Sequence, residues 1–164
     1  MKEVTTWHLE MNDSAELREV SDSRDMQIGE CRIDQFEYNR FLYTQVGAGW
    51  EWLDKLNWND DQWRDYVEDE NLRTFVGYVG ASPAGYFELQ RQANSQIEIA
   101  YFGLLPAFIG KGYGGYLLSQ AIKTAWASGA ARVWVHTCSL DHPSARANYE
   151  ARGMKLFLTE KAPV

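Results

Sequence analysis

Residues 98–118 read EIAYFGLLPAFIGKGYGGYLL, which predicts a strand, a glycine-rich loop and the start of a helix in direct succession. The strand carries one carboxylate, Glu98, and ends at Pro106, and four glycines follow between positions 110 and 115. Glycine lets a ligand approach the backbone closely, and a helix N-terminus offers free N–H groups and positive potential. The stretch therefore predicts a binding site for a phosphorylated ligand.

Two nucleotide-binding motifs compete for this loop. A mononucleotide P-loop requires Gly-x4-Gly-Lys-Ser/Thr, but Leu105 replaces the first glycine and Gly112 the hydroxyl residue. The dinucleotide fingerprint Gly-x-Gly-x-x-Gly fits from Gly110, but the acidic residue expected about 20 positions later is missing from residues 133–137, VWVHT. Too little chain remains for a second nucleotide-binding half. A glycine-rich turn without a ligand stays as the simplest alternative.

Two segments carry a third interpretation. Residues 109–114, IGKGYG, and the following GYLL are similar to a pyrophosphate loop of the pattern Arg/Gln-x-x-Gly-x-Gly/Ala and to the helix after it. Residues 145–154, ARANYEARGM, are similar to an Ala-x3-Tyr-x3-Gly-Phe segment. Together they resemble the GNAT superfamily of N-acetyltransferases. Ile109 stands where that family usually has Arg or Gln, and Met154 replaces the aromatic residue.

The hydrophobic pattern and the resemblance agree on one α/β (α+β) domain over residues 1–164. The resemblance implies a twisted, mixed but mainly antiparallel β-sheet flanked by helices, with central strands that splay apart. We expect strands over residues 4–11, 26–31, 73–79, 84–91, 96–104, 132–138 and 155–159. We expect helices over residues 34–46, 59–68 and 143–152, and a further helix between the glycine loop and Gly129. Capping boxes are expected at Asp34 and Asn59, Pro143 is expected at a first helical position, and residues 80–83 are expected to form a hairpin turn.

Acetyl transfer to an amine sets the chemistry that the site needs. An ammonium group has no lone pair, so a base must remove a proton, and the leaving thiolate needs a proton or a hydrogen bond. Glu98 is the candidate general base, directly or through water, because strand alternation places its side chain opposite Ile97 and Ile99. Tyr149, in the Ala-x3-Tyr-x3-Gly pattern, is the candidate general acid. Each also has a structural alternative, a solvent-facing glutamate or a tyrosine that packs on the sheet.

The resemblance also implies how acetyl-CoA binds. Its pantetheine arm is expected to pair with backbone groups of Leu104 and Leu105, where an N–H can act as an oxyanion donor. His142 stands where the family often has an arm-binding Asn. The phosphates are expected at Ile109, Gly110, Lys111, Gly112, Tyr113, Gly114 and Gly115.

Residues 49–63, GWEWLDKLNWNDDQW, contain four tryptophans and bear on the acceptor. Tryptophan offers apolar area and a face that attracts cations. With Asp54, Asp60 and Asp61 nearby, the segment can form an aromatic, acid-rimmed amine pocket with Trp50 and Trp52 in its wall. It can equally cover the sheet as ordinary core. The acceptor is therefore expected to be a small-molecule or peptide amine that the sequence does not identify.

Composition fits a cytoplasmic enzyme. The net charge of −7 argues against a nucleic-acid partner, and no apolar run approaches the length of a membrane span. Cys31 and Cys138 fit no metal spacing, and His136 and His142 form no metal pair, so no metal is expected. A homodimer is compatible with an exposed sheet edge. A coenzyme A-binding sensor or a catalytically idle module is the alternative to an enzyme, and a dinucleotide-dependent oxidoreductase is a third.

Overall fold

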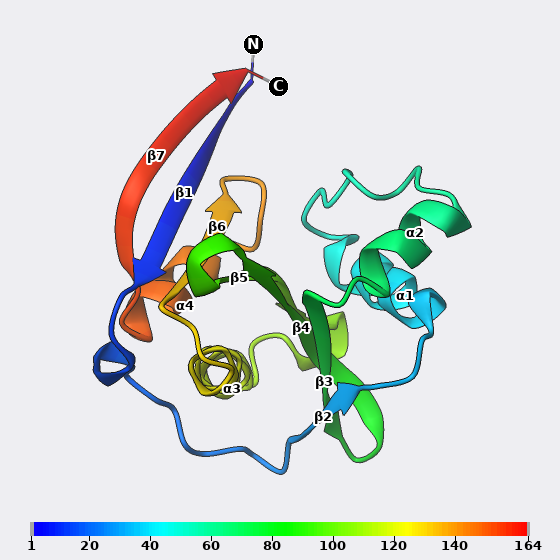
Figure 1. Ribbon diagram of the computed structural model, residues 1–164, viewed down its shortest axis with the longest axis horizontal. Coiled ribbons are helices and arrows are strands. Elements are labelled where there is room, and N and C mark those ends of the chain that lie inside the picture. The colour runs from blue at the N-terminus through cyan, green and yellow to red at the C-terminus, as the bar shows by residue number, and fades with distance from the viewer. Residues whose placement is uncertain (1, 164) are drawn as a thin grey trace.

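The computed structural model describes residues 2–163 and consists of one seven-stranded sheet with helices on both faces (Figure 1). The strand order is β2-β3-β4-β5-β6-β1-β7. The strands are β1 (Glu3–Met11), β2 (Gln27–Cys31), β3 (Leu72–Val79), β4 (Ser82–Gln92), β5 (Gln96–Leu104), β6 (Arg132–Cys138) and β7 (Lys155–Pro163). The helices are α1 (Phe36–Gly47), α2 (Asp60–Val67), α3 (Gly114–Ala127) and α4 (Ala145–Ala151), with 3-10 turns at Ser14–Glu16, Ala93–Ser95 and Pro106–Phe108. The expected fold class is confirmed.

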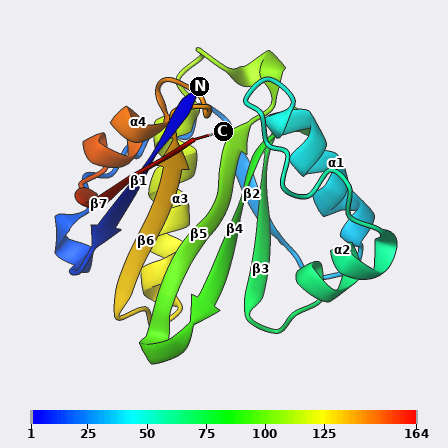
Figure 2. The same cartoon turned by 90° about the horizontal axis from the view of Figure 1, so that it is seen from above.

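Helices cover both faces of the sheet (Figure 2), and each face has its own apolar core. On one face, α3 buries its stripe of Leu117, Leu118, Ala121, Ile122 and Ala125 against the central strands. On the other face, α1 and α2 cover strands β3 to β5 through two smaller clusters. The helical periodicity seen in the sequence therefore corresponds to the face that α3 turns toward the sheet.

The sheet opens between its two central strands, β5 and β6. They form the parallel pair in the sheet, and their pairing covers only Gln96 to Glu98 of β5 and Arg132 to Trp134 of β6. Beyond Glu98 the two strands diverge (Figure 2). The splayed central strands that the resemblance implied are present, and the gap leaves unpaired backbone groups along the later part of β5.

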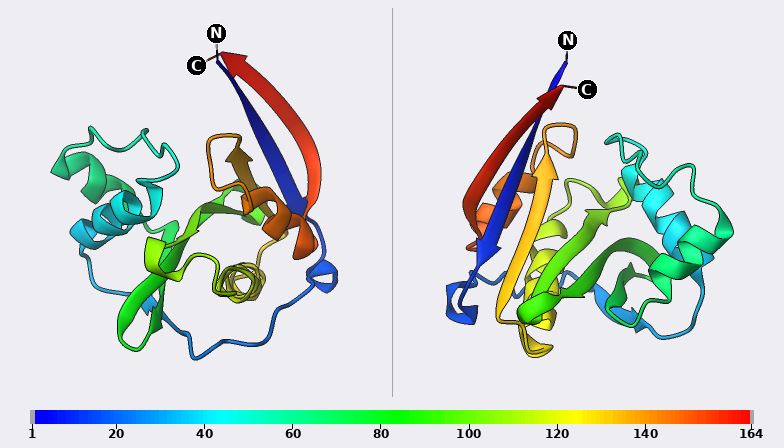
Figure 3. Two further views of the ribbon diagram at one scale, coloured as in Figure 1. Left: turned by 180° about the vertical axis from the view of Figure 1, so that it is seen from behind. Right: turned by 45° about the horizontal axis from the view of Figure 1, so that its top comes forward.

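The first strand takes a position that the sequence did not predict. β1 lies between β6 and β7 and runs antiparallel to both, with Glu3 opposite Pro163. Together β1 and β7 form a two-stranded arm that extends past the rest of the sheet (Figure 3). β7 is the outer strand, and it leaves Leu156, Phe157 and Leu158 between 41% and 45% exposed.

The capping box at Asn59 and a hairpin turn within residues 80–83 are confirmed, and two local predictions are wrong. The capping box of Asn59 and Gln62 is present. The box expected at Asp34 is absent, because α1 begins at Phe36 and Gln35 is its cap residue, without a side-chain hydrogen bond. Pro143 is not a first helical residue, because α4 begins two positions later. The hairpin turn is shorter than expected. It consists of Gly80 and Ala81, both with positive φ as a type I′ turn requires, while Ser82 and Pro83 belong to β4.

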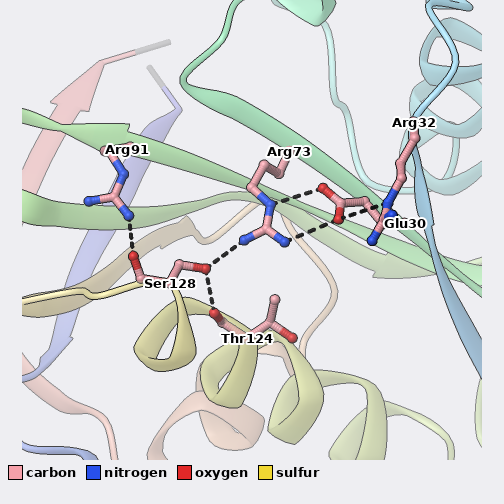
Figure 4. A network of polar contacts seen from close by, with 6 residues as sticks. All are labelled: Glu30, Arg32, Arg73, Arg91, Thr124 and Ser128. Atoms are coloured by element: carbon pink, nitrogen blue, oxygen red, sulfur yellow. Dashed lines mark hydrogen bonds and ion pairs between the residues drawn. The ribbon is translucent and has the colours of Figure 1, made fainter.

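Arginines from the sheet hold the C-terminal end of α3 (Figure 4). Arg73 binds both carboxylate oxygens of Glu30, at 2.9 and 3.1 Å, and donates to the Ser128 hydroxyl at 2.6 Å. Arg91 donates to the Ser128 carbonyl. Positive charge is favourable at a helix C-terminus, so this network fixes α3 against strands β2 to β4. No helix within residues 2–163 is long and apolar enough to span a membrane.

Candidate functional site

Two cavities meet beside the gap between β5 and β6. The first, of about 290 Å³, extends from the glycine loop to α4, and the second, of about 570 Å³, extends over the face that carries Glu98. The residues that line both are Trp50, Trp52, Phe102, Asp141 and Tyr149. A ligand in the first cavity and a ligand in the second would therefore meet next to Tyr149.

The glycine loop presents its amides at the entrance of the first cavity. Gly110 and Gly112 have φ values of +77° and +88°, a conformation that favours glycine, and α3 begins at Gly114. Within residues 2–163, no turn or loop carbonyl accepts a hydrogen bond from the amides of Gly110 to Gly115. Asn148 of α4 donates to the Gly114 carbonyl at 3.1 Å and so ties the two helices together. Free amides, positive φ and a helix N-terminus fit a diphosphate group.

The backbone of β5 offers one of the two expected pairing positions to an extended ligand. The Leu105 N–H donates to the Ala84 carbonyl at 2.8 Å, so the expectation that Leu105 pairs with the arm is wrong for its N–H. Residues alternate in direction along an antiparallel strand. Leu104, opposite Gly85, therefore turns its N–H and C=O toward the gap between β5 and β6, and it also lines the first cavity.

The other predicted coenzyme residues divide into two groups. Ile109, Gly110, Gly112, Gly114, Gly115 and His142 line the first cavity. The His142 ring lies 4.6 Å from that of Trp50, and its Nδ1 accepts a hydrogen bond from the Ser144 amide. Tyr113 instead packs edge-on against Phe108 at 5.8 Å, and Lys111 is exposed.

Tyr149 is held by α4 at the junction of the two cavities and is 3% exposed. Its ring packs edge-on against Phe102 of β5, with 6.1 Å between centroids. Burial raises the pKa of Tyr149 well above its ordinary value, so the phenol keeps its proton throughout the physiological range. A protonated phenol at this place can donate to an atom in either cavity.

Glu98 lies in the second cavity and is paired. Its Oε1 accepts a hydrogen bond from Gln92 at 2.9 Å, and its Oε2 lies 3.0 Å from Nδ1 of His136 on β6. The hydrogen bond with Glu98 raises the pKa of His136 above 6.5, against the opposing effect of burial. The sequence was used only to exclude His136 as a metal ligand, and it does not predict this pair. Only the short parallel register of β5 and β6 brings the two residues together.

A β-bulge sets which side chains share the face of Glu98. Glu88 pairs with Tyr101 and Leu89 pairs with Ile99, so Ala100 is an extra residue in β5. Strict alternation would place Tyr101 on the face opposite Glu98. The bulge instead brings both side chains into the second cavity.

Two of the four tryptophans line the cavities, as the pocket interpretation predicts, and the other two pack together as ordinary core. Trp50 and Trp52 line both cavities, whereas Trp58 and Trp63 pack against each other at 5.3 Å. Asp54 lines the second cavity and accepts hydrogen bonds from Tyr43 and Tyr101 at 3.1 and 2.5 Å. The other two acids lie elsewhere, since Asp60 pairs with Arg40 and Asp61 pairs with Arg64.

The second cavity also contains Lys55, which the sequence analysis did not predict as a site residue. The Lys55 ammonium lies 4.3, 4.6 and 4.9 Å from the ring centres of Trp58, Tyr66 and Tyr101. It is also 3.7 Å from Oδ2 of Asp54. Such an arrangement stabilises a cation by its contact with aromatic faces. The tryptophans of residues 49–63 indicated an aromatic site for a cation. The cation that lies among the rings of Trp58, Tyr66 and Tyr101 is Lys55 of the chain itself.

Several solved structures are similar to this chain in fold. A GCN5-related N-acetyltransferase from Kribbella flavida has a TM-score of 0.69 and 16% identity over 94% of this chain. A second one, from Sphaerobacter thermophilus, has a TM-score of 0.73 and 12% identity over 97% of this chain. The aminoglycoside acetyltransferase meta-AAC0020, from an uncultured soil metagenomic sample, has a TM-score of 0.64 and 15% identity over 79% of this chain.

These likenesses establish a shared fold. The chain spans 55% and 51% of the length of the Kribbella and Sphaerobacter proteins and 88% of the aminoglycoside acetyltransferase. No curated protein matches the sequence. Residues 32–154, well over half of the chain, match the model described as the acetyltransferase (GNAT) family. The chain therefore belongs to the GNAT acetyltransferase family.

Proposed function

We propose that the protein transfers an acetyl group from acetyl-CoA directly to a primary amine. The observation that carries this proposal is the meeting of the two cavities at Tyr149. When bound, acetyl-CoA supplies an activated acetyl thioester. The loop amides of Gly110 to Gly115 would hold its phosphates, and Leu104 would pair with its extended arm.

Glu98 and His136 form the base of the proposed reaction. The amine must lose a proton before it can attack, and the Glu98 carboxylate faces the second cavity where an amine or a bridging water can reach it. His136, 3.0 Å away, keeps the carboxylate oriented and can pass the proton on. The imidazole is half exposed, which gives that proton a route to solvent.

Tyr149 is the proposed acid. A thiolate leaving the first cavity needs a hydrogen-bond or proton donor, and the phenol of Tyr149 keeps its proton because of burial. It lines the coenzyme cavity and the acceptor cavity together. Cys138 also lines the second cavity. No covalent step through Cys138 is proposed, because its thiol makes no hydrogen bond or ion pair to a base within residues 2–163.

The second cavity favours a cationic acceptor. Its lining contains four acidic residues, Glu51, Asp54, Glu98 and Asp141, against Lys55 and His136. Trp50 and Trp52 add aromatic faces. We propose that the acceptor arrives as an ammonium, bound by these acids and rings, and is deprotonated by Glu98.

A spectrophotometric assay of thiol release tests the proposal. Acetyl-CoA is offered with a panel of alkylamines, amino acids, peptides and aminoglycosides, and product mass is measured for each active amine. We expect turnover on at least one cationic amine, with loss of activity in Glu98→Gln. Coenzyme binding without turnover on any amine would instead support the sensor alternative.

A further inference from the structure

The glycine loop carries an aliphatic residue at the position from which the family's side chain contacts phosphate. Ile109 lines the first cavity and offers neither charge nor a hydrogen bond. Two arginines from other segments, Arg24 and Arg152, lie against the glycines of the same loop.

Arg24 reaches the loop from the segment between β1 and β2. A Cβ atom placed on Gly112 would lie 2.7 Å from both Nε and Cζ of Arg24, so the guanidinium rests on the glycine. Arg24 and Asp25 have φ values of +49° and +64°, which are costly for residues other than glycine. This backbone directs the side chain to the loop, yet no ion pair of Arg24 is present within residues 2–163.

Arg152 reaches the loop from the end of α4. A Cβ atom on Gly115 would lie 2.5 Å from its Nη1, which donates to Asn148 at 3.3 Å. Its Nε is buried without a hydrogen-bond partner, and burial lowers the pKa of Arg152. The acid nearest to it along the chain, Glu150, pairs with Arg146 instead. A partly buried cation at the positive end of α3, with its Nε shielded from solvent, is unfavourable without an anion.

We propose that Arg24 and Arg152 bind the phosphate groups of the acyl-CoA, and so supply the charge that Ile109 lacks. The inference rests on the proposed function. The two guanidinium groups stand beside Gly112 and Gly115, which themselves line the first cavity, so a phosphate held by the loop amides would lie within their reach. Guanidinium and phosphate form charge-assisted, paired hydrogen bonds that neutral side chains do not provide.

Isothermal titration calorimetry of Arg24→Gln and Arg152→Gln tests this assignment with two ligands, acetyl-CoA and S-acetylpantetheine, which lacks every phosphate. Each variant is expected to weaken acetyl-CoA binding by about tenfold, the scale of a hydrogen bond to a charged group. Binding of S-acetylpantetheine is expected to stay unchanged. Arg32→Gln is the charge-matched control, since Arg32 is 82% exposed and pairs with Glu30 at 3.6 Å.

Two further measurements separate the outcomes. Arg152→Lys keeps the charge and loses the planar fork, so its acetyl-CoA affinity is expected to lie between those of wild type and Arg152→Gln. If the glutamine variant is unstable, the lysine variant takes its place in the test. Unchanged acetyl-CoA affinity in both arginine variants, with wild type binding normally, would overturn the inference and leave the proposed function standing. Equal weakening of S-acetylpantetheine would also overturn it, because the change would then lie in the cavity. Failure of wild type to bind acetyl-CoA would defeat the proposed function itself.

Discussion

The Nδ1 atom of His136 lies 3.0 Å from the Oε2 atom of Glu98, across the only stretch of residues 2–163 where two strands pair in parallel. The hydrogen bond raises the pKa of His136 above 6.5, so its imidazole stays protonated to a higher pH than a free histidine. Its pairing with Glu98 therefore stabilises the fold below pH 6.5, and this contribution is lost as the pH rises through the raised pKa.

The pair predicts a pH dependence of turnover. As the pH rises through the pKa of His136, the imidazole becomes neutral and the pair can accept a proton from the acceptor amine. We expect kcat/KM to increase with pH, with a midpoint above 6.5. In Glu98→Gln the largest cause of the shift is absent, so the His136 titration followed by NMR should move to lower pH. Glu160→Gln, which removes the acid beside His8, is the control and should leave His136 nearly unchanged. A His136 titration that does not respond to Glu98→Gln would contradict the pairing.

Tyr149→Phe removes only a hydroxyl group from the junction of the cavities. The ring still fills its place against Phe102, so acetyl-CoA affinity should be nearly unchanged. Turnover should fall by about 10²-fold, the lower range for loss of a general acid. Tyr78→Phe, which removes a hydroxyl that pairs with Tyr38 at 3.0 Å, is the matched control and should retain full activity. Wild-type rates in Tyr149→Phe would remove this residue from the mechanism.

Local sequence patterns predicted the elements well, because their causes are local. β5 and β6 were placed at residues 96–104 and 132–138, the bounds that the structure shows. The glycines of the loop marked the start of α3, where positive φ values at Gly110 and Gly112 require them. The resemblance predicts Tyr149 as a site residue, and in the structure Tyr149 lies at the junction of two cavities.

Features that depend on contacts between residues far apart in the sequence could not be predicted from local patterns. The pairing of Glu98 with His136 depends on strand register, and the position of Tyr101 depends on an extra residue in β5. The contact of Arg24 with Gly112 joins two loop segments that are far apart in the sequence, and no sequence pattern links them. Asp34 matches a capping pattern, but α1 begins at Phe36 with Gln35 as its cap residue, one position beyond the one that the pattern predicts.

Gly110→Ala and Gly112→Ala form a matched pair at the loop. Both residues have positive φ, so each alanine should cost about 1–2 kcal/mol of local backbone energy. A Cβ atom on Gly110 meets nothing within 4 Å, whereas one on Gly112 meets the Arg24 guanidinium. Calorimetry should therefore show the greater loss of acetyl-CoA affinity for Gly112→Ala. Equal affinities for the two variants would show that displacement of Arg24 has no effect on binding.

Arg73→Met tests the support of α3 at the end remote from the cavities. The substitution removes a bidentate contact with Glu30, a hydrogen bond to Ser128 and the guanidinium group that lies 5.0 Å from the centre of the Phe75 ring. Because Arg73 is 40% exposed, solvent weakens these contacts, and we expect a loss of about 1 kcal/mol in the free energy of unfolding at pH 7. Arg32→Met is the control, since Arg32 is 82% exposed and 3.6 Å from Glu30.

The pH dependence of this loss identifies its cause. The hydrogen bond from Arg73 lowers the pKa of Glu30 below 4.5, so the pair stabilises the fold above that pH and weakens as the pH falls through the lowered pKa. The difference in urea unfolding between wild type and Arg73→Met should therefore shrink in acid. A difference that stays constant with pH would assign the effect to lost packing on Phe75 instead. Acetyl-CoA affinity should not change in either case, because the phosphate loop lies at the other end of α3.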